Sequence, residues 1–179
     1  NDTGIADGQD ILGAWHASDD QYHYFRMDLE AAPSNANGYA TLYGIYIDSM
    51  AGGGSGLETE YVPDSLSGID FILDSHFYGD TLAWQHHDYH VWDDGNGSFT
   101  TYQPGETPFF ATEQNGNSLE WQVIKSAIGD DFEWMAVSHS TAFPDETHDV
   151  AAVPLPGAIL LLGSGILGVG AIRWKKGVF

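Results

Sequence analysis

Histidine and aspartate alternate in the segment His86-His87-Asp88-Tyr89-His90. In an extended strand every second side chain points to the same face, so His86, Asp88 and His90 would share one face. Two imidazoles and one carboxylate are a ligand set that suits zinc, copper or iron. The alternative is a solvated polar strand face, because neighbouring ligands on one strand rarely converge on an ion without a bulge.

Carboxylates also gather in segments with turn chemistry, where oxygen ligands would suit calcium. The candidate ligands are Asp19, Asp20, Asp48, Asp93 and Asp94. None of these segments has the full twelve-residue EF-hand pattern with its terminal glutamate. Calcium is the metal that these turns favour, although plain acidic loops that keep a protein soluble would have the same sequence.

Three tryptophans, Trp84, Trp92 and Trp121, could form a flat platform on which sugar rings stack. The alternative is that they pack in the core, as most tryptophans of a small β domain do. Signals of catalysis are weak. No G-x-S-x-G elbow is present, and the many carboxylates single out no acid and base pair. We therefore expect a protein that is not an enzyme.

The charge of the chain is strongly asymmetric. All 26 acidic residues lie at or before Asp149, where Arg26 and Lys125 are the basic residues, so this part carries a net charge of −24. A field of this sign repels phosphate backbones, so we expect no nucleic-acid partner. The chain has no cysteine, which excludes disulfides, thiolate metal sites and cysteine nucleophiles.

The elements that must position these side chains have the two-residue period of strands. The alternation predicts inward faces made of His23, Phe25, Met27 and Leu29 in one strand and Tyr43, Ile45 and Ile47 in another. Strands are predicted at residues 13–17, 21–29, 39–48, 68–73, 81–92, 98–102, 118–124 and 132–139. Short strands separated by Gly, Asn and Asp turns, without a long amphipathic helix, predict a mainly β domain over residues 1–150. A single β-sandwich or jelly roll is the expected architecture.

Three of these segments resemble the carbohydrate-binding-module family 9 and related DOMON-like sandwiches. They are an early aromatic strand, Gln21–Leu29, an acidic strand, Tyr43–Asp48, and a late strand with a short turn, Leu119–Ile128. The resemblance implies an extracellular β-sandwich, often with bound calcium and sometimes with bound sugar or haem. It does not imply catalysis.

The composition changes abruptly after the acidic domain. Residues 151–157 form a Pro-containing hinge, residues 158–172 carry no charge, and Arg173, Lys175 and Lys176 give the chain a basic end. We expect one hydrophobic helix over residues 158–179. Its uncharged part would be about 22 Å long, which is short for a bilayer unless flanking residues extend it. The basic end would stay in the cytoplasm and leave the acidic domain outside.

The tail begins with the motif Val153-Pro154-Leu155-Pro156-Gly157, followed by the apolar run and the basic end. In this order the three parts resemble the PEP-CTERM sorting signal of Gram-negative bacteria, although Leu155 stands where that family has glutamate. The resemblance implies export, recognition by an exosortase and delivery to the cell surface or extracellular matrix. Small residues that allow close helix packing are Gly163, Gly165, Gly168 and Gly170.

Together these features predict an exported structural or adhesive surface protein of a Gram-negative bacterium. Its C-terminal helix would anchor it in the membrane or assemble it into a homo-oligomer or filament. The alternative is a surface carbohydrate-binding module that contacts a polysaccharide.

Overall fold

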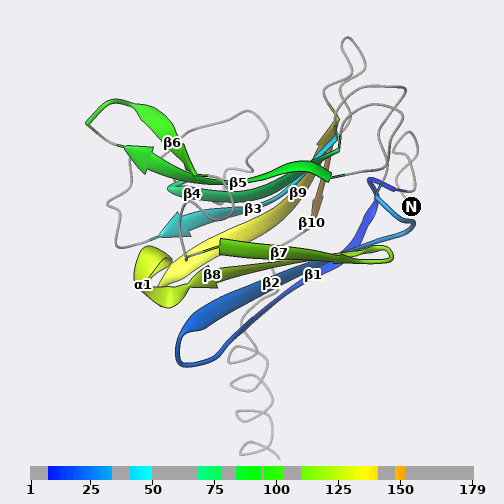
Figure 1. Cartoon of the computed structure of the whole chain (residues 1–179), viewed down its shortest axis with the longest axis horizontal. Coiled ribbons are helices and arrows are strands. Elements are labelled where there is room, and N and C mark those ends of the chain that lie inside the picture. Colours follow the sequence, from blue (N-terminus) through cyan, green and yellow to red (C-terminus); the bar gives the residue numbers. More distant parts are fainter. Residues whose placement is uncertain are drawn as a thin grey trace, which may run out of the picture.

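A computed structural model describes residues 8–33, 41–49, 68–77, 84–93, 95–102, 110–140 and 148–151. The described strands form two antiparallel sheets that lie one above the other (Figure 1). The chain is thus mainly β, as predicted, and the arrangement is consistent with a β-sandwich. The C-terminal tail after Ala151 lies outside the described residues, and so do the predicted sorting motif and the packing glycines. Among the described residues, no helix is long and apolar enough to cross a membrane.

The smaller sheet has four strands in the order β1-β2-β8-β7. Their bounds are Ile11–Ser18 for β1, Tyr22–Leu29 for β2, Phe110–Asn115 for β7 and Ser118–Ile124 for β8. Hairpins join β1 to β2 and β7 to β8, and β2 pairs with β8 across a long separation in sequence. A single turn of helix, α1 (Lys125–Ile128), follows β8.

The larger sheet has six strands in the order β10-β9-β3-β4-β5-β6. Their bounds are Thr41–Ser49 for β3, Phe71–Phe77 for β4, Trp84–Asp93 for β5, Ser98–Tyr102 for β6, Phe132–Ser140 for β9 and His148–Ala151 for β10. The last described strand, β10, ends at Ala151, next to the predicted boundary between domain and hinge.

The main core lies between the two sheets and is built by alternation. The predicted inward residues of β2 are all buried: His23 is 2% exposed, Phe25 1%, and Met27 and Leu29 0%. Tyr43, Ile45 and Ile47 of β3 are also fully buried, and they belong to the same hydrophobic cluster as Phe25, Met27 and Leu29. The period-two prediction is therefore confirmed for both strands.

The outer face of the larger sheet carries a second, smaller core. Ile69, Met135 and Val137 form this cluster, with Tyr46, Ile72, Phe99 and Val150 packed against it. The central strand β3 is consequently buried or half-buried at every position. Polar side chains that alternation directs to the outer face of this sheet are therefore withdrawn from solvent, and this is where the candidate site lies.

Aromatic rings from both sheets lie around two histidines at one end of the core, of which His16 is exposed and His23 is 2% exposed. The His16 ring of β1 lies 4.9 Å from the Phe25 ring and 5.3 Å from the Phe132 ring, and its Nε2 lies 3.0 Å from His23 Nδ1. Partial desolvation by the neighbouring rings, with smaller contributions from the charges of His23 and Lys125, lowers the pKa of His16 to about 4. Burial also lowers the pKa of His23, against the opposing effect of its hydrogen bond to the Gly129 carbonyl.

We expect acid to destabilise the domain through this histidine pair. Between about pH 6.5 and about pH 4 the unfolded state binds protons that the folded His16 does not, so stability present above this range is lost as the pH falls. Thermal unfolding followed across this range should give a shallower fall for His16→Gln than for the unmodified chain. The pKa of His76 is raised, so this residue makes stability depend on pH in the opposite direction. Its contribution is the same in the unmodified chain and in His16→Gln and cancels in the comparison. Identical pH profiles would contradict the expectation.

Candidate metal centre

The site lies on the outer face of the larger sheet, where β4 and β5 pair in antiparallel register. Asp74 of β4 is directly opposite Asp88 of β5, and Ile72 is opposite His90. Asp74 therefore has Asp88 as its cross-strand partner and His90 as its diagonal neighbour. A regular ladder thus brings together three side chains from two strands, without a bulge at this point.

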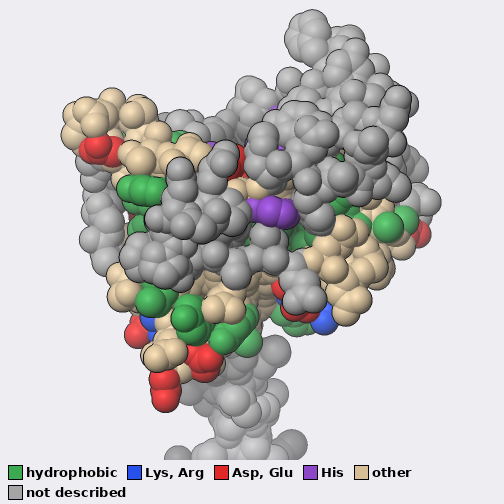
Figure 2. All heavy atoms as spheres, viewed as in Figure 1, with side chains coloured by type: hydrophobic (Ala, Val, Ile, Leu, Met, Phe, Trp, Pro, Cys, Tyr) green, Lys and Arg blue, Asp and Glu red, His purple; other side chains and the backbone are tan. Residues whose placement is uncertain are grey.

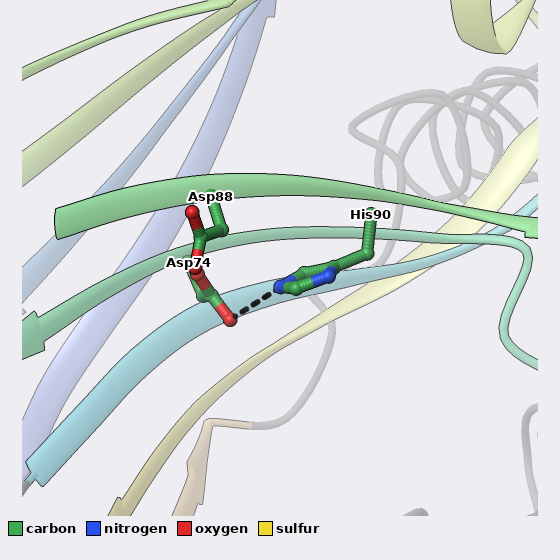
Figure 3. Close-up of side chains that lie close together, drawn as sticks. All are labelled: Asp74, Asp88 and His90. Atoms are coloured by element: carbon green, nitrogen blue, oxygen red, sulfur yellow. Dashed lines mark hydrogen bonds and ion pairs between the residues drawn. The ribbon is translucent and has the colours of Figure 1, made fainter. Parts of the chain in front are cut away.

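Asp74, Asp88 and His90 each offer a ligand atom, and these atoms all lie within 4.8 Å of one another. Figure 3 shows the two carboxylates next to each other and the His90 ring reaching toward Asp74. The site is withdrawn from solvent, since Asp74 is 4% and Asp88 7% exposed. Two carboxylates and an imidazole are donors that bind divalent metal ions.

His90 connects the two ends of the site by hydrogen bonds. Its Nε2 lies 3.1 Å from Asp74 Oδ2, and its Nδ1 lies 2.9 Å from the Thr101 hydroxyl of β6. A hydroxyl can either donate or accept, so Thr101 is compatible with both neutral tautomers of His90. Thr101 therefore holds the ring in place whether or not Nε2 carries the proton. A metal-bound histidine needs such a partner on its other ring nitrogen.

His76 approaches the same carboxylate from β4. Its Nε2 also lies 3.1 Å from Asp74 Oδ2, and its side chain is 13% exposed. Burial alone would raise the pKa of Asp74, but the hydrogen bonds and charges of His76 and His90 outweigh it and lower that pKa. Conversely, burial lowers the pKa of His76 and the Asp74 and Asp88 carboxylates raise it, with a net rise.

Two carboxylate oxygens of the site lack hydrogen-bond partners. Asp74 Oδ1 and Asp88 Oδ1 are buried and accept no hydrogen bond from the part of the chain that the structure describes. Buried polar atoms are normally satisfied, and like charges directly opposite on a sheet destabilise it. A cation between the two strands would supply the missing partner for both oxygens. The donor set and the unsatisfied oxygens therefore fit a divalent ion.

A glycine opens the space beside this site. Gly44 of β3 is the cross-strand partner of Asp74 on the other side of β4. A Cβ atom at this position would lie 2.9 Å from the Tyr46 ring and 3.5 Å from Asp74 Cβ. The absence of a side chain at position 44 therefore leaves room for the Tyr46 ring over this residue.

The sequence identified two of the three grouped residues. Asp88 and His90 share a face as predicted, and the backbone of His86 lies opposite that of His76 in the ladder. Nothing is described of the His86 side chain. Asp74 and His76 were not predicted, because their membership depends on which strand lies next to β5. Their own alternation in Asp74-Ser75-His76 was the available signal.

The carboxylates of two acidic turns accept hydrogen bonds from backbone N–H groups of the same turn. Asp19 Oδ1 accepts hydrogen bonds from the backbone N–H groups of Gln21 and Tyr22, and Asp93 Oδ1 accepts one from Gly95. Asp48 is 4% exposed at the end of β3. Within the described ranges, none of Asp19, Asp20, Asp48 and Asp93 belongs to a group of three potential ligands, and Asp94 lies outside those ranges.

The tryptophans of the predicted platform do not share one surface. Trp121 is 1% exposed, and its Nε1–H donates to Ser75 Oγ of the opposite sheet at 3.1 Å, so it is a core residue. This corrects the expectation for Trp121, whose position on β8 faces the other sheet. Trp92 is half-buried against Phe99, with ring centroids 5.1 Å apart. The Trp84 side chain lies outside the described residues.

Among the described side chains, the large exposed aromatics lie instead on the smaller sheet. Trp15 is 49% and Tyr24 37% exposed. A Cβ atom at Gly13 would lie 2.7 Å from the Trp15 ring, so that ring lies over Gly13. The Tyr24 hydroxyl donates to Asp19 Oδ2 at 2.7 Å, near the end of the β1–β2 hairpin. On the face seen in Figure 2, hydrophobic and acidic side chains lie next to one another in the lower part of the domain.

No protein-family model, curated protein or solved structure matches this chain.

Proposed function

We propose that this chain is an exported surface protein whose β-sandwich domain binds one divalent metal ion through Asp74, Asp88 and His90. The observation that carries the metal binding is the convergence of three ligand atoms within 4.8 Å, with a buried, unsatisfied oxygen on each carboxylate. A cation there would neutralise two facing charges in a chain that has 26 acidic residues.

The bound ion would have a structural role. The three ligands are buried or half-buried, whereas a catalytic ion needs an open coordination position for its substrate. The ligands come from β4 and β5, and the hydroxyl that supports His90 comes from β6. An ion would therefore tie together the strands at one edge of the larger sheet.

The stability of the chain tests this proposal. A ligand that binds only the folded state at about 100 times its dissociation constant stabilises that state by about 2.7 kcal/mol. For a chain of this size the melting temperature should rise by about 5–10 °C when zinc is added after chelation. Metal analysis of the dialysed protein should find one ion per chain. An unchanged melting curve with no retained metal would exclude the metal centre.

Surface display is supported by the sequence of the tail. The motif at residues 153–157, the uncharged run and the basic end resemble a PEP-CTERM signal, which would direct export and exosortase recognition. We propose that the helix over residues 158–179 then anchors the protein or provides contacts between copies. An apolar helix outside a membrane must be covered, and the same helix of neighbouring copies could cover it.

Removing residues 157–179 should leave a soluble, monomeric domain with its β-sheet spectrum intact. Gly165→Leu or Gly168→Leu in the full chain should weaken assembly while the domain stays folded, because a larger side chain prevents close helix approach. Light scattering and electron microscopy would measure the assembly. Fibres formed by the truncated chain would place the polymer contact in the β domain instead.

Carbohydrate binding is the second candidate function, and the position of Trp15 favours it. A ring that lies over Gly13 with almost half of its residue exposed can stack on a sugar face. Beside it, the Arg26 side chain is held by Asp28 at 2.7 Å and by the Ser118 hydroxyl at 3.0 Å. Saturable polysaccharide binding that Trp15→Ala abolishes would favour this function, and a negative polysaccharide screen would exclude it.

A further inference from the structure

We infer that His76 is a fourth ligand of this centre and that the centre takes a four-coordinate transition-metal ion of the zinc class, not calcium. This inference rests on the proposed metal binding at Asp74, Asp88 and His90. It adds a residue outside the three-membered group and names the chemical class of the ion.

The position of His76 is the first argument. It follows Asp74 by two residues on β4, so alternation places both side chains on the outer face. Its Nε2 lies 3.1 Å from Asp74 Oδ2, the same distance that separates His90 Nε2 from this oxygen. Imidazole nitrogens from two neighbouring strands therefore converge on one carboxylate oxygen, which marks a point that both nitrogens can reach.

The Asp74 carboxylate can adjust to an ion at this point. Its terminal torsion is soft, and its Oδ1 has no hydrogen-bond partner among the described residues. Rotation of the carboxylate would release both nitrogens from Oδ2 and present an oxygen to the ion. Two neutral imidazoles and two carboxylates would then balance the charge of a divalent cation.

The donor set decides between classes of metal. Calcium takes six to eight oxygen ligands, including backbone carbonyls from loops. Here two carboxylates are available, and they lie opposite each other in an antiparallel ladder that is in register up to His76 and shifts between His76 and Phe77. Two nitrogens and two oxygens suit the tetrahedral coordination that zinc adopts in structural sites. The sequence-based preference for calcium therefore does not extend to this centre.

Cobalt(II) is the probe that tests this, because its visible spectrum reports coordination number directly. Titration of the full chain with cobalt(II) should give the intense visible bands of a four-coordinate ion, and zinc should displace them while excess calcium should not. The His76→Gln variant should bind cobalt about 10-fold to 100-fold more weakly. Its spectrum should show the weak bands of a six-coordinate ion. His139→Gln is the matched control, since its backbone lies on β9, separated from β4 by β3.

The outcomes separate the inference from the proposed function. Tight cobalt binding by His76→Gln with the unmodified spectrum would overturn the role of His76 but retain the metal centre. Six-coordinate cobalt in the unmodified chain, or displacement by calcium, would overturn the four-coordinate transition-metal assignment. Absence of cobalt binding by the unmodified chain would overturn both. Circular dichroism of each variant establishes that it is folded before its spectrum is compared.

Discussion

Replacing Trp121 by alanine is expected to lower the free energy of unfolding by about 3–5 kcal/mol. The side chain is 1% exposed in the core between the sheets, so its removal leaves a large cavity. Its Nε1–H also donates to Ser75 Oγ at 3.1 Å, which links β8 of one sheet to β4 of the other. Urea unfolding followed by circular dichroism would measure the loss.

The matched control is the same substitution on the same sheet. Trp15→Ala on β1 removes a ring whose residue is 49% exposed, and its effect should be about 0.5 kcal/mol or less. Equal destabilisation by the two substitutions would contradict the assignment of Trp121 to the core and Trp15 to the surface.

The second large effect is that Asp88→Asn should change the free energy of unfolding in opposite directions without and with zinc. In the chelated protein, Asp88→Asn removes one of two facing buried charges, so the free energy of unfolding should stay the same or rise by up to about 1 kcal/mol. With zinc present the order should reverse, because the variant loses a ligand and with it the stabilisation of about 2.7 kcal/mol. Denaturant unfolding with and without zinc measures both values.

Asp28→Asn provides the control for this reversal. Asp28 accepts a hydrogen bond from Arg26 on the outer face of the smaller sheet, on the sheet that does not hold the centre. Its replacement should lower stability slightly and by the same amount with or without zinc. A difference between Asp88→Asn and the unmodified chain that zinc does not change would mean that Asp88 has no part in metal binding.

The strands with one clear inward face could be predicted from the sequence. In β2 the alternation of buried and exposed residues matches the prediction residue by residue. Strand β7 was not predicted, because Phe110-Ala111-Thr112-Glu113-Gln114-Asn115 has no regular hydrophobic alternation. It is an edge strand whose pairing with β8 follows from the tight turn at Gly116, where φ is 66°. The four-residue strand β10 is too short to have a period of its own.

The candidate site was predicted in part for a related reason. Alternation within one strand places Asp88 and His90 on one face, and this needs no knowledge of the fold. The addition of Asp74 and His76 requires the pairing of β4 with β5 in one particular register, since a shift by one residue would turn both side chains to the core. Register depends on the packing of the whole sheet, which a single sequence does not reveal.

The second hydrophobic cluster, on the outer face of the larger sheet, was also not predicted from the sequence. A sheet with one solvent-exposed face should carry polar residues on that face. On the outer face of the larger sheet, however, Met135 is 1% and Val137 is 2% exposed. The run Trp134-Met135-Ala136-Val137 in β9 is apolar on both faces, which is typical of a strand that is buried on both sides. This run was the signal in the sequence that the outer face of the larger sheet is covered.

The candidate ligands Asp74, Asp88 and His90 offer only nitrogen and oxygen, in a chain without a single sulfhydryl group. Thiolate centres fail in air because sulfur is oxidised to disulfides or to sulfinic and sulfonic acids. Imidazoles and carboxylates do not follow that route, so thiol oxidation could not remove a ligand from such a centre. Acid would release its ion instead, since protonation removes the lone pairs that bind it. Retention of the ion would thus depend on proton concentration and not on the oxidation state of sulfur ligands.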